Sequence, residues 1–361
     1  MDAFTNPRRS GAPAKRRSAA ASRVESRPEV RVGPIRPLAD LLREHGLKPD
    51  EVLAGVGLPT TIFDDPENWI SFSDLSNLLQ ACSALSGGSN CGLRVGSRFR
   101  LDSLGLLGQL MKNSPTLRDA LRLGALHLNL HDRGALSLTL DLGEEFSALG
   151  YALFDGTLGA AEQILDGAIA MQFLLLRELC GPDWKPAVVQ FSHRRPADVT
   201  ALRNFFGPRI EFDAQLSANV FESRWLDQPI RGANPETYAA LMAEVARHEE
   251  QCALSFAEQV RRSIYAVTIT GTANEASLAR LFGLNERTFR RRLEEEGNTL
   301  RAILSTVRRE WSRHLLSDTE LPVSEIAWIL GYSDPTVFAR AFRTWTTQSP
   351  SEWRVRRVPG A

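Results

Sequence analysis

The stretch LPVSEIAWILGYSDPTVFARAFRTW, residues 321–345, decides the fold of the C-terminal part of the chain. Its first ten positions carry apolar residues at the spacing of one helix face, namely Val323, Ile326, Ala327 and Leu330. Gly331 follows where the chain must turn, and glycine takes a positive φ at little cost. Ser333 or Asp334 can then cap a second helix, whose first turn accommodates Pro335. The stretch therefore predicts two short helices joined by a sharp turn, which is a helix-turn-helix unit.

The second helix of this unit has an inner and an outer face. Phe338 and Phe342 lie one turn apart and are expected to anchor the helix in the core. The outer face then carries Thr336, Val337, Arg340 and Arg343. Arginine pairs in bidentate fashion with guanine in the major groove and also binds phosphate. We therefore predict that these four residues contact duplex DNA.

A second copy of the pattern occurs upstream, in ANEASLARLFGLNERTFRRRLEEEG, residues 273–297. Here Gly283 stands at the expected turn and Asn285 at the expected cap of the following helix. Phe289 and Leu293 are predicted to point inward, and the DNA-binding candidates on the outer face are Arg287, Thr288, Arg290 and Arg291. The three glutamates at positions 294–296 end this helix, and we expect them to be solvated.

The segment between the two units, LRAILSTVRREWSRHLL at residues 300–316, has one apolar stripe. Its members are Leu300, Ile303, Leu304, Val307, Trp311 and Leu315. This stripe predicts a rigid helix that holds the two units in a fixed relation. Arg308 and Arg309 lie off the stripe and are expected to attract DNA without sequence preference.

Residues 34–250 have a mixed pattern that predicts an α+β domain. Helical spacing in 72–85 is followed by a helix start at Ser114-Pro115, with Ser114 as the expected cap. GALSLTLDLG, residues 134–143, alternates leucine with polar residues and predicts a half-buried strand, with 146–154 as its partner. A long helix is predicted from Leu158 to Leu179, followed by further strands and a short helix up to about residue 223. The fold class expected is thus an α+β N-terminal domain, which the resemblance described below makes an effector domain, followed by an all-α C-terminal domain with two helix-turn-helix units.

Composition and charge support this division of the 361-residue chain. Residues 1–33 lack hydrophobic periodicity and are predicted to be a disordered basic tail, followed by domains at 34–250 and 251–361. The formal net charge is zero, yet residues 1–32 hold eight basic and three acidic side chains and residues 271–361 hold fourteen and eleven. This segregation is typical of a polyanion partner at the basic end. No apolar segment approaches the length of a membrane span, and no signal peptide is recognisable, so we expect a cytoplasmic protein.

Other candidate sites lack the full set of residues that a metal site or a catalytic site needs. His127 and His131 lie four residues apart, but no third metal ligand accompanies them, so no metal or other cofactor is expected. Neither a nucleotide-binding glycine loop nor a hydrolase motif occurs, and we predict no catalytic residues and no enzyme activity. Arg194 and Arg195, at the end of an expected strand, are weak candidates for binding a ligand carboxylate, and a surface strand end is the simpler explanation for them.

The C-terminal motifs resemble those of one known family. The segment EIAWILGYSDPTVFARAFRTWTTQSPSEWR, residues 325–354, is similar to the second helix-turn-helix of AraC/XylS-family regulators. The matching positions are Ile326, Ala327, Gly331, Tyr332, Ser333, Phe338, Arg340, Phe342, Pro350 and Arg354. Two positions depart from the family pattern, because Thr347 replaces a usual glycine and Trp353 a usual tyrosine. The first unit resembles the family's other motif, and residues 203–230 resemble the subgroup with an arabinose-binding-like N-terminal domain.

This resemblance implies a DNA-binding transcription regulator that responds to a small-molecule effector of unknown identity. It further implies activation rather than repression, contact with RNA polymerase, and a homodimer as one assembly. The two recognition helices would enter successive major grooves, about one helical turn or 10 bp apart. An alternative remains open at this stage, namely a ligand-independent regulator whose N-terminal domain only dimerises.

Overall fold

The computed structural model describes residues 28–86, 90–153, 158–251, 255–269, 274–282, 284–319 and 321–356. The strands are β1 Glu29–Arg31, β2 Trp69–Ser71, β3 Ala135–Asp141, β4 Phe146–Leu153, β5 Val188–Gln190, β6 Ile210–Glu211 and β7 Ser217–Glu222. The N-terminal helices are α1 Pro37–Glu44, α2 Pro49–Gly55, α3 Phe72–Ser86, α4 Cys91–Gly96, α5 Leu106–Lys112, α6 Leu117–Leu126, α7 Ala161–Cys180, α8 Thr200–Phe206 and α9 Pro235–Gln251. The C-terminal helices are α10 Phe256–Ile269, α11 Glu275–Leu281, α12 Glu286–Glu295, α13 Leu300–Asp318, α14 Val323–Ile329, α15 Pro335–Thr346 and α16 Pro350–Arg356.

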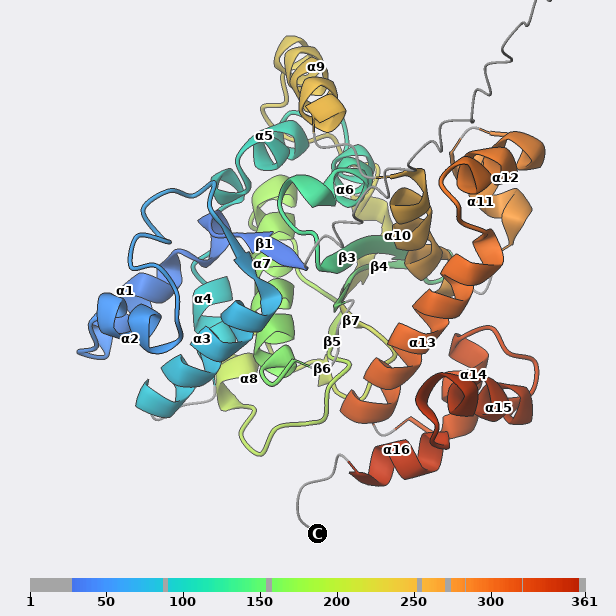
Figure 1. Cartoon of the computed structure of the whole chain (residues 1–361). Coiled ribbons are helices and arrows are strands. Elements are labelled where there is room, and N and C mark those ends of the chain that lie inside the picture. Colours follow the sequence, from blue (N-terminus) through green and yellow to red (C-terminus); the bar gives the residue numbers. More distant parts are fainter. Residues whose placement is uncertain are drawn as a thin grey trace, which may run out of the picture.

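A five-stranded sheet organises the N-terminal part, with the strand order β3-β4-β7-β5-β6. Its neighbouring strands run antiparallel except for β5 and β6, which are parallel. The long helix α7 packs along β4 and β7, and α1 to α4 lie on its far side (Figure 1). The mixture of sheet and helices confirms the predicted α+β class, and no described helix has the length and apolar character needed to cross a membrane.

The two faces of this sheet contact different parts of the molecule. Leu149, Tyr151 and Leu153 of β4 belong to the N-terminal core, which also contains α7. The leucines of β3 and alanines of β4 and β7 belong instead to a cluster shared with the C-terminal helices, which includes Leu136, Leu138, Leu140, Ala148, Ala152 and Ala218. The strand at 135–141 is therefore half-buried within the N-terminal part alone, and the C-terminal helices cover its other face.

The register of the sheet explains why small residues alternate with large ones on this shared face. Leu138 pairs with Gly150, and Leu140 pairs with Ala148. A Cβ atom at Gly150 would lie only 2.2 Å from a methyl group of Leu216, so a larger residue cannot be placed there without a shift. Small residues on β4 thus leave room for leucines from the neighbouring segments.

Two predictions about the N-terminal part are wrong. Residues up to 33 were expected to be disordered, but 29–31 form β1, which pairs with β2, and Val30 and Val32 are buried. The rest of the expected tail, residues 1–27, lies outside the described residues. The helix start at 114–117 is capped by Thr116 rather than Ser114, because Thr116 and Asp119 bond reciprocally, with Asp119 N at 3.2 Å and Asp119 Oδ2 at 2.7 Å from the threonine hydroxyl.

The C-terminal helices are arranged around α13. Figure 1 shows α13 running between the pair α11–α12 and the group α14–α16. Four residues of the predicted stripe of α13 are buried, namely Ile303, Val307, Trp311 and Leu315, whereas Leu300 and Leu304 are half-buried. Helix α10 contacts α11, α12 and α13 and also strand β3, so it is the helix that joins the two parts of the molecule.

Candidate nucleic-acid interface and internal cavity

The second helix-turn-helix unit has the geometry that its sequence predicts. Gly331 ends α14 with a φ of +74°, and Asp334 caps α15 by accepting a 2.7 Å hydrogen bond from the amide of Thr336. The hydrogen bonds from Thr336, with the charge of Arg340 nearby, hold the pKa of Asp334 below its usual value. Phe338 and Phe342 are completely buried, and the four predicted contact residues Thr336, Val337, Arg340 and Arg343 are all exposed.

The first unit is similar, with one difference that concerns its arginines. Asn285 caps α12 through a 2.9 Å bond from the amide of Thr288, and Phe289 and Leu293 are buried. The predicted turn residue Gly283 lies outside the described residues. Arg287, Arg290 and Arg291 are exposed and Thr288 is half-buried.

Arg290 does not extend freely from α12. Its Nε and Nη2 atoms donate to the two carboxylate oxygens of Glu275 at 3.1 and 3.0 Å, which ties α12 to α11. The hydrogen bond to Glu275 also raises the pKa of Arg290. Arg291 lies 3.7 Å from Glu295 one turn along the same helix, whereas Arg287 makes no ion pair with another described residue. Of the three arginines, Arg287 is thus the most available for DNA.

The linking helix and the last helix brace the second unit. Arg354, which matches the family signature, donates to the carbonyl of Leu321, between α13 and α14, at 2.7 Å and to that of Leu316 in α13 at 3.4 Å, and so fixes α16 to the end of α13. Trp353 packs edge-on against Phe342, with ring centroids 5.7 Å apart, in place of the usual tyrosine. Arg308 was expected to attract phosphate, but its guanidinium lies 4.9 Å from the ring centre of Tyr332, beside the turn of the second unit. This contact supports the turn, and the contact of Arg308 with phosphate stays a prediction.

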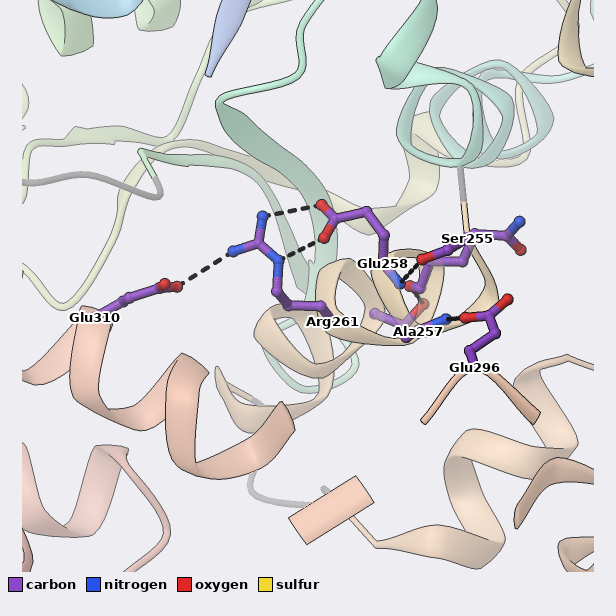
Figure 2. A network of polar contacts seen from close by, with 8 residues as sticks. Ser255, Ala257, Glu258, Arg261, Glu296 and Glu310 are labelled. Carbon is purple, nitrogen blue, oxygen red and sulfur yellow. Dashed lines mark hydrogen bonds and ion pairs between the residues drawn. The ribbon is translucent and has the colours of Figure 1, made fainter. Parts of the chain in front are cut away.

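Glu296 is exposed to solvent, as expected, but it also has a structural role that the sequence did not predict. Its two carboxylate oxygens accept hydrogen bonds from the amides of Phe256 and Ala257, each at 2.7 Å, and they cap α10 from the end of α12 (Figure 2). Ser255 caps the next amide, that of Glu258, at 3.2 Å. The sequence signal that was missed is long-range, because forty residues separate the carboxylate from the helix that it caps.

A second link in Figure 2 joins α10 to α13. Arg261 of α10 forms a bidentate pair with Glu258 at 2.8 and 2.9 Å and also donates to Glu310 of α13 at 3.2 Å. Together with Glu296, these contacts make α10 one unit with α12 and α13. A displacement of α10 relative to the sheet would therefore be transmitted to both recognition helices.

The N-terminal core contains a cavity of about 120 Å³ between α7, the inner face of β3–β4 and the first helices. Most of its wall is apolar, and six lining residues carry polar groups, namely His131, Asp132, Ser137, Tyr151, Gln163 and Gln172. Four of these form a continuous polar corner. Tyr151 donates to Asp132 at 2.6 Å, Ser137 pairs with Tyr151 across the strands, and Gln172 donates to Ser137 at 3.2 Å.

The sequence did not identify these residues as a site. Only His131 was considered, as half of a metal pair, and the described residues contain no cluster of three metal-ligating side chains. Burial, with the charge of Arg31, lowers the pKa of His131 to about 3, so the ring is neutral. The candidates Arg194 and Arg195 follow β5, and neither lines the cavity.

Comparison with known proteins agrees with both halves of the molecule. Residues 46–230 match the family model described as the arabinose-binding domain of AraC transcription regulators, and this match covers slightly more than half of the chain. The chain belongs to the AraC family. Residues 278–356 match a helix-turn-helix domain model. This AraC-type chain is therefore a DNA-binding transcription regulator rather than an enzyme, as its motifs predict.

Similar proteins extend over nearly the whole AraC-type chain. An ornithine utilization regulator of Pseudomonas aeruginosa is 29% identical over 328 residues, which is 88% of this chain and 94% of the relative. The HTH-type transcriptional regulator VirS of Mycobacterium tuberculosis is 25% identical over 317 residues, covering 87% and 93%. The crystal structure of the regulator CdpR from Pseudomonas aeruginosa covers 89% of this chain and 97% of its own, with 22% identity and a TM-score of 0.45.

Proposed function

We propose that this regulator binds a specific duplex sequence through residues 251–361 and that a small molecule bound within residues 34–250 controls this binding. The observation that carries the DNA-binding part is the pair of capped helices, α12 and α15, each with two buried apolar anchors on one face and exposed arginines on the other. A helix of this kind fits the major groove, where side chains reach base edges.

The two helices are proposed to divide their work among particular residues. Arg287 and Arg291 of α12 and Thr336, Val337 and Arg340 of α15 would face the bases or the adjacent phosphates. Arg290 and Arg343 would contact mainly the phosphates of the DNA backbone. Arg290 would have to break its hydrogen bonds with Glu275 before it could reach a base. The spacing of the two contacts on DNA would be about one helical turn.

Control by an effector is supported by the position of the cavity. Ser137 and Tyr151 line the cavity from the inner face of β3 and β4, while Leu136 and Leu138 pack with the C-terminal cluster on the outer face of β3. A ligand that shifts these strands would change the surface of β3 against which α10 packs, and with it the orientation of α12 and α13. Such a ligand acts by its difference in affinity for the two arrangements. We further propose that the regulator activates transcription, through contact with RNA polymerase, as a homodimer.

Duplexes selected from a random pool by the full-length protein would test DNA binding. The logarithm of the affinity should fall by about 0.9 per phosphate contact for each unit of log salt concentration, and footprints should recur at about 10 bp. The double variant Arg287→Ala/Arg340→Ala should lose selective binding. The control Arg122→Ala changes an exposed arginine of α6, which pairs with Asp119 on the same helix, and should bind normally. A salt slope near zero would refute duplex binding of this kind.

Transcription in a purified system with RNA polymerase tests activation, and sedimentation tests the dimer. If no metabolite stabilises the protein and transcription does not respond to any cavity variant, the alternative of a ligand-independent regulator replaces effector control.

A further inference from the structure

The polar corner of the cavity offers hydrogen-bonding groups that the protein itself does not satisfy. Gln172 is buried, and its Nε2 donates to the carbonyl of Gly150 and to Ser137, both at 3.2 Å. This bond to a carbonyl fixes the orientation of the amide, because the amide oxygen could not donate there. The Oε1 atom of Gln172 and the Nδ1 atom of His131 are inaccessible to solvent and have no partner among the described protein groups.

The remaining polar groups are already engaged. Asp132 accepts from Tyr151 at 2.6 Å and from the amides of Gly134 and Ala135 at 2.8 and 2.9 Å. Gln163 bonds with Ser83 through both ends of its amide, at 3.1 and 2.9 Å. The groups left unsatisfied at this corner are thus an acceptor at Gln172 and a nitrogen of the neutral imidazole of His131, beside the hydroxyl of Ser137.

The charge at this corner also limits the ligand. No lysine or arginine lines the described wall of the cavity. The nearest cation, Arg31, is paired with Glu67 and donates to the carbonyl of Leu104 at 2.9 Å. A carboxylate in the cavity would have no counter-ion, and an ammonium group would find only a carboxylate, Asp132, whose oxygens already accept three hydrogen bonds. Burial of an unpaired charge is strongly unfavourable.

The size of the cavity sets the ligand's bulk. Its volume of about 120 Å³ is close to that of an engineered apolar cavity of about 150 Å³ that binds benzene. We infer, on the basis of the effector control proposed above, that the ligand is a small uncharged amphiphile. It has a ring-sized apolar body and a single group that both donates and accepts a hydrogen bond, as a phenol or an alicyclic alcohol does.

A sugar does not fit this corner, despite the name of the matching family model. A pentose carries hydroxyls around its whole ring, and the apolar walls formed by residues such as Leu75, Leu107 and Met171 offer them no partners. Each buried hydroxyl without a partner weakens binding. The unsatisfied groups, the charge and the volume therefore all favour an alcohol or phenol of ring size.

The test measures binding of phenol, cyclohexanol, toluene, benzoate and arabinose to the full-length protein, by calorimetry and by the shift in melting temperature. Phenol and cyclohexanol should bind saturably, toluene more weakly, and benzoate and arabinose not at all. Gln172→Met keeps the bulk but removes the acceptor, so phenol should bind about tenfold more weakly while toluene is unaffected. Ser137→Ala tests the same corner without changing the bond of Gln172 to Gly150.

A cavity-filling variant separates this site from others. Ala168 lines the cavity and is half-buried, so Ala168→Phe should abolish binding of phenol without lowering the melting temperature of the free protein. Absence of phenol binding, or equal binding of benzoate or arabinose, would overturn the proposed ligand class. Phenol that binds but leaves DNA affinity unchanged would retain the ligand class and refute effector control. If a charged ligand or a sugar alters DNA binding of the wild-type protein but not of Ala168→Phe, effector control is retained and the proposed ligand class is refuted.

Discussion

Replacement of Glu296 by alanine should separate α10 from the end of α12. The carboxylate accepts the amides of Phe256 and Ala257 at 2.7 Å each, and no other described group caps these two positions. An acceptor at a helix N-terminus contributes about 1 kcal/mol, and a charged acceptor near the helix dipole contributes more. Because Glu296 is exposed to solvent, which screens its charge, we expect a loss of about 2 kcal/mol rather than the full value for two buried charged bonds.

The assay is thermal unfolding of the full-length protein, followed by hydrogen exchange of the peptide that contains α10. If the C-terminal helices unfold as a unit of about one hundred residues, a loss of this size lowers their melting temperature by roughly 8 °C. Glu296→Gln retains one amide acceptor and should lose about half as much. The exchange of the Phe256 and Ala257 amides should accelerate before that of the rest of α10.

Glu294→Ala is the matched control, since it removes a glutamate from the same cluster that does not contact α10. Its effect should be within about 0.5 kcal/mol of zero. Equal destabilisation by the two alanine variants would refute the capping role and would leave Glu296 with the same role as the other two exposed glutamates. Unchanged exchange at Phe256 would do the same.

Three further outcomes are expected from other parts of the chain. Thr347 occupies the left-handed region at φ +65°, which is strained for a β-branched residue, so Thr347→Gly should raise the free energy of unfolding by about 1 kcal/mol in urea titrations; a loss would show that the threonine hydroxyl outweighs the strain. The pKa of His131 is about 3 in the folded protein and about 6.5 in an unfolded chain. Stability from its neutral ring is therefore complete above about pH 6.5 and is lost as the pH falls towards 3, with about 1 kcal/mol gone near pH 5.5, and His131→Leu should remove this part of the pH dependence. Arg340→Ala should cost about 1–3 kcal/mol on a selected duplex and much less on a scrambled one, whereas Arg308→Ala should chiefly lower the melting temperature, because it loses the contact with Tyr332. An equal loss on both duplexes would make Arg340 a phosphate contact.

The helix-turn-helix units could be predicted because their determinants are local. Asn285 and Asp334 cap helices that begin at the next residue, and the buried phenylalanines lie within the same ten-residue segments. Each signal is complete inside a window that a periodicity argument can cover. The exposed faces of α12 and α15 follow directly from the same spacing.

The alternation in β3 could be recognised, but not what it faces. Leu136 and Leu138 have the pattern of a strand on its own core, yet they contact the C-terminal cluster. A period of two fixes which residues share a face and carries no information about the partner. Only the register of β3 with β4 and the position of α10 settle that question.

The polar contacts that matter most could not be predicted at all. Glu296 lies forty residues from Phe256, and Gln172 lies thirty-five residues from Ser137. Both pairs depend on the packing of complete helices, so the side chains meet only after the core has formed. β1 was missed for a related reason, since three residues without a visible partner do not distinguish a strand from a tail.

Because side chains alternate between the two faces along β3 and β4, substitutions in these strands fall into two groups with different effects. At positions 137, 149 and 151 a substitution changes the wall of the internal cavity, while at positions 136, 138, 140 and 148 it changes the surface that packs against the C-terminal helices. The two sets are interleaved along the same strands but lie on opposite sides of one sheet. Under the proposed effector control, ligand preference can therefore diversify among descendants, or in a designed library for a biosensor, while the surface that packs against the C-terminal helices stays constant.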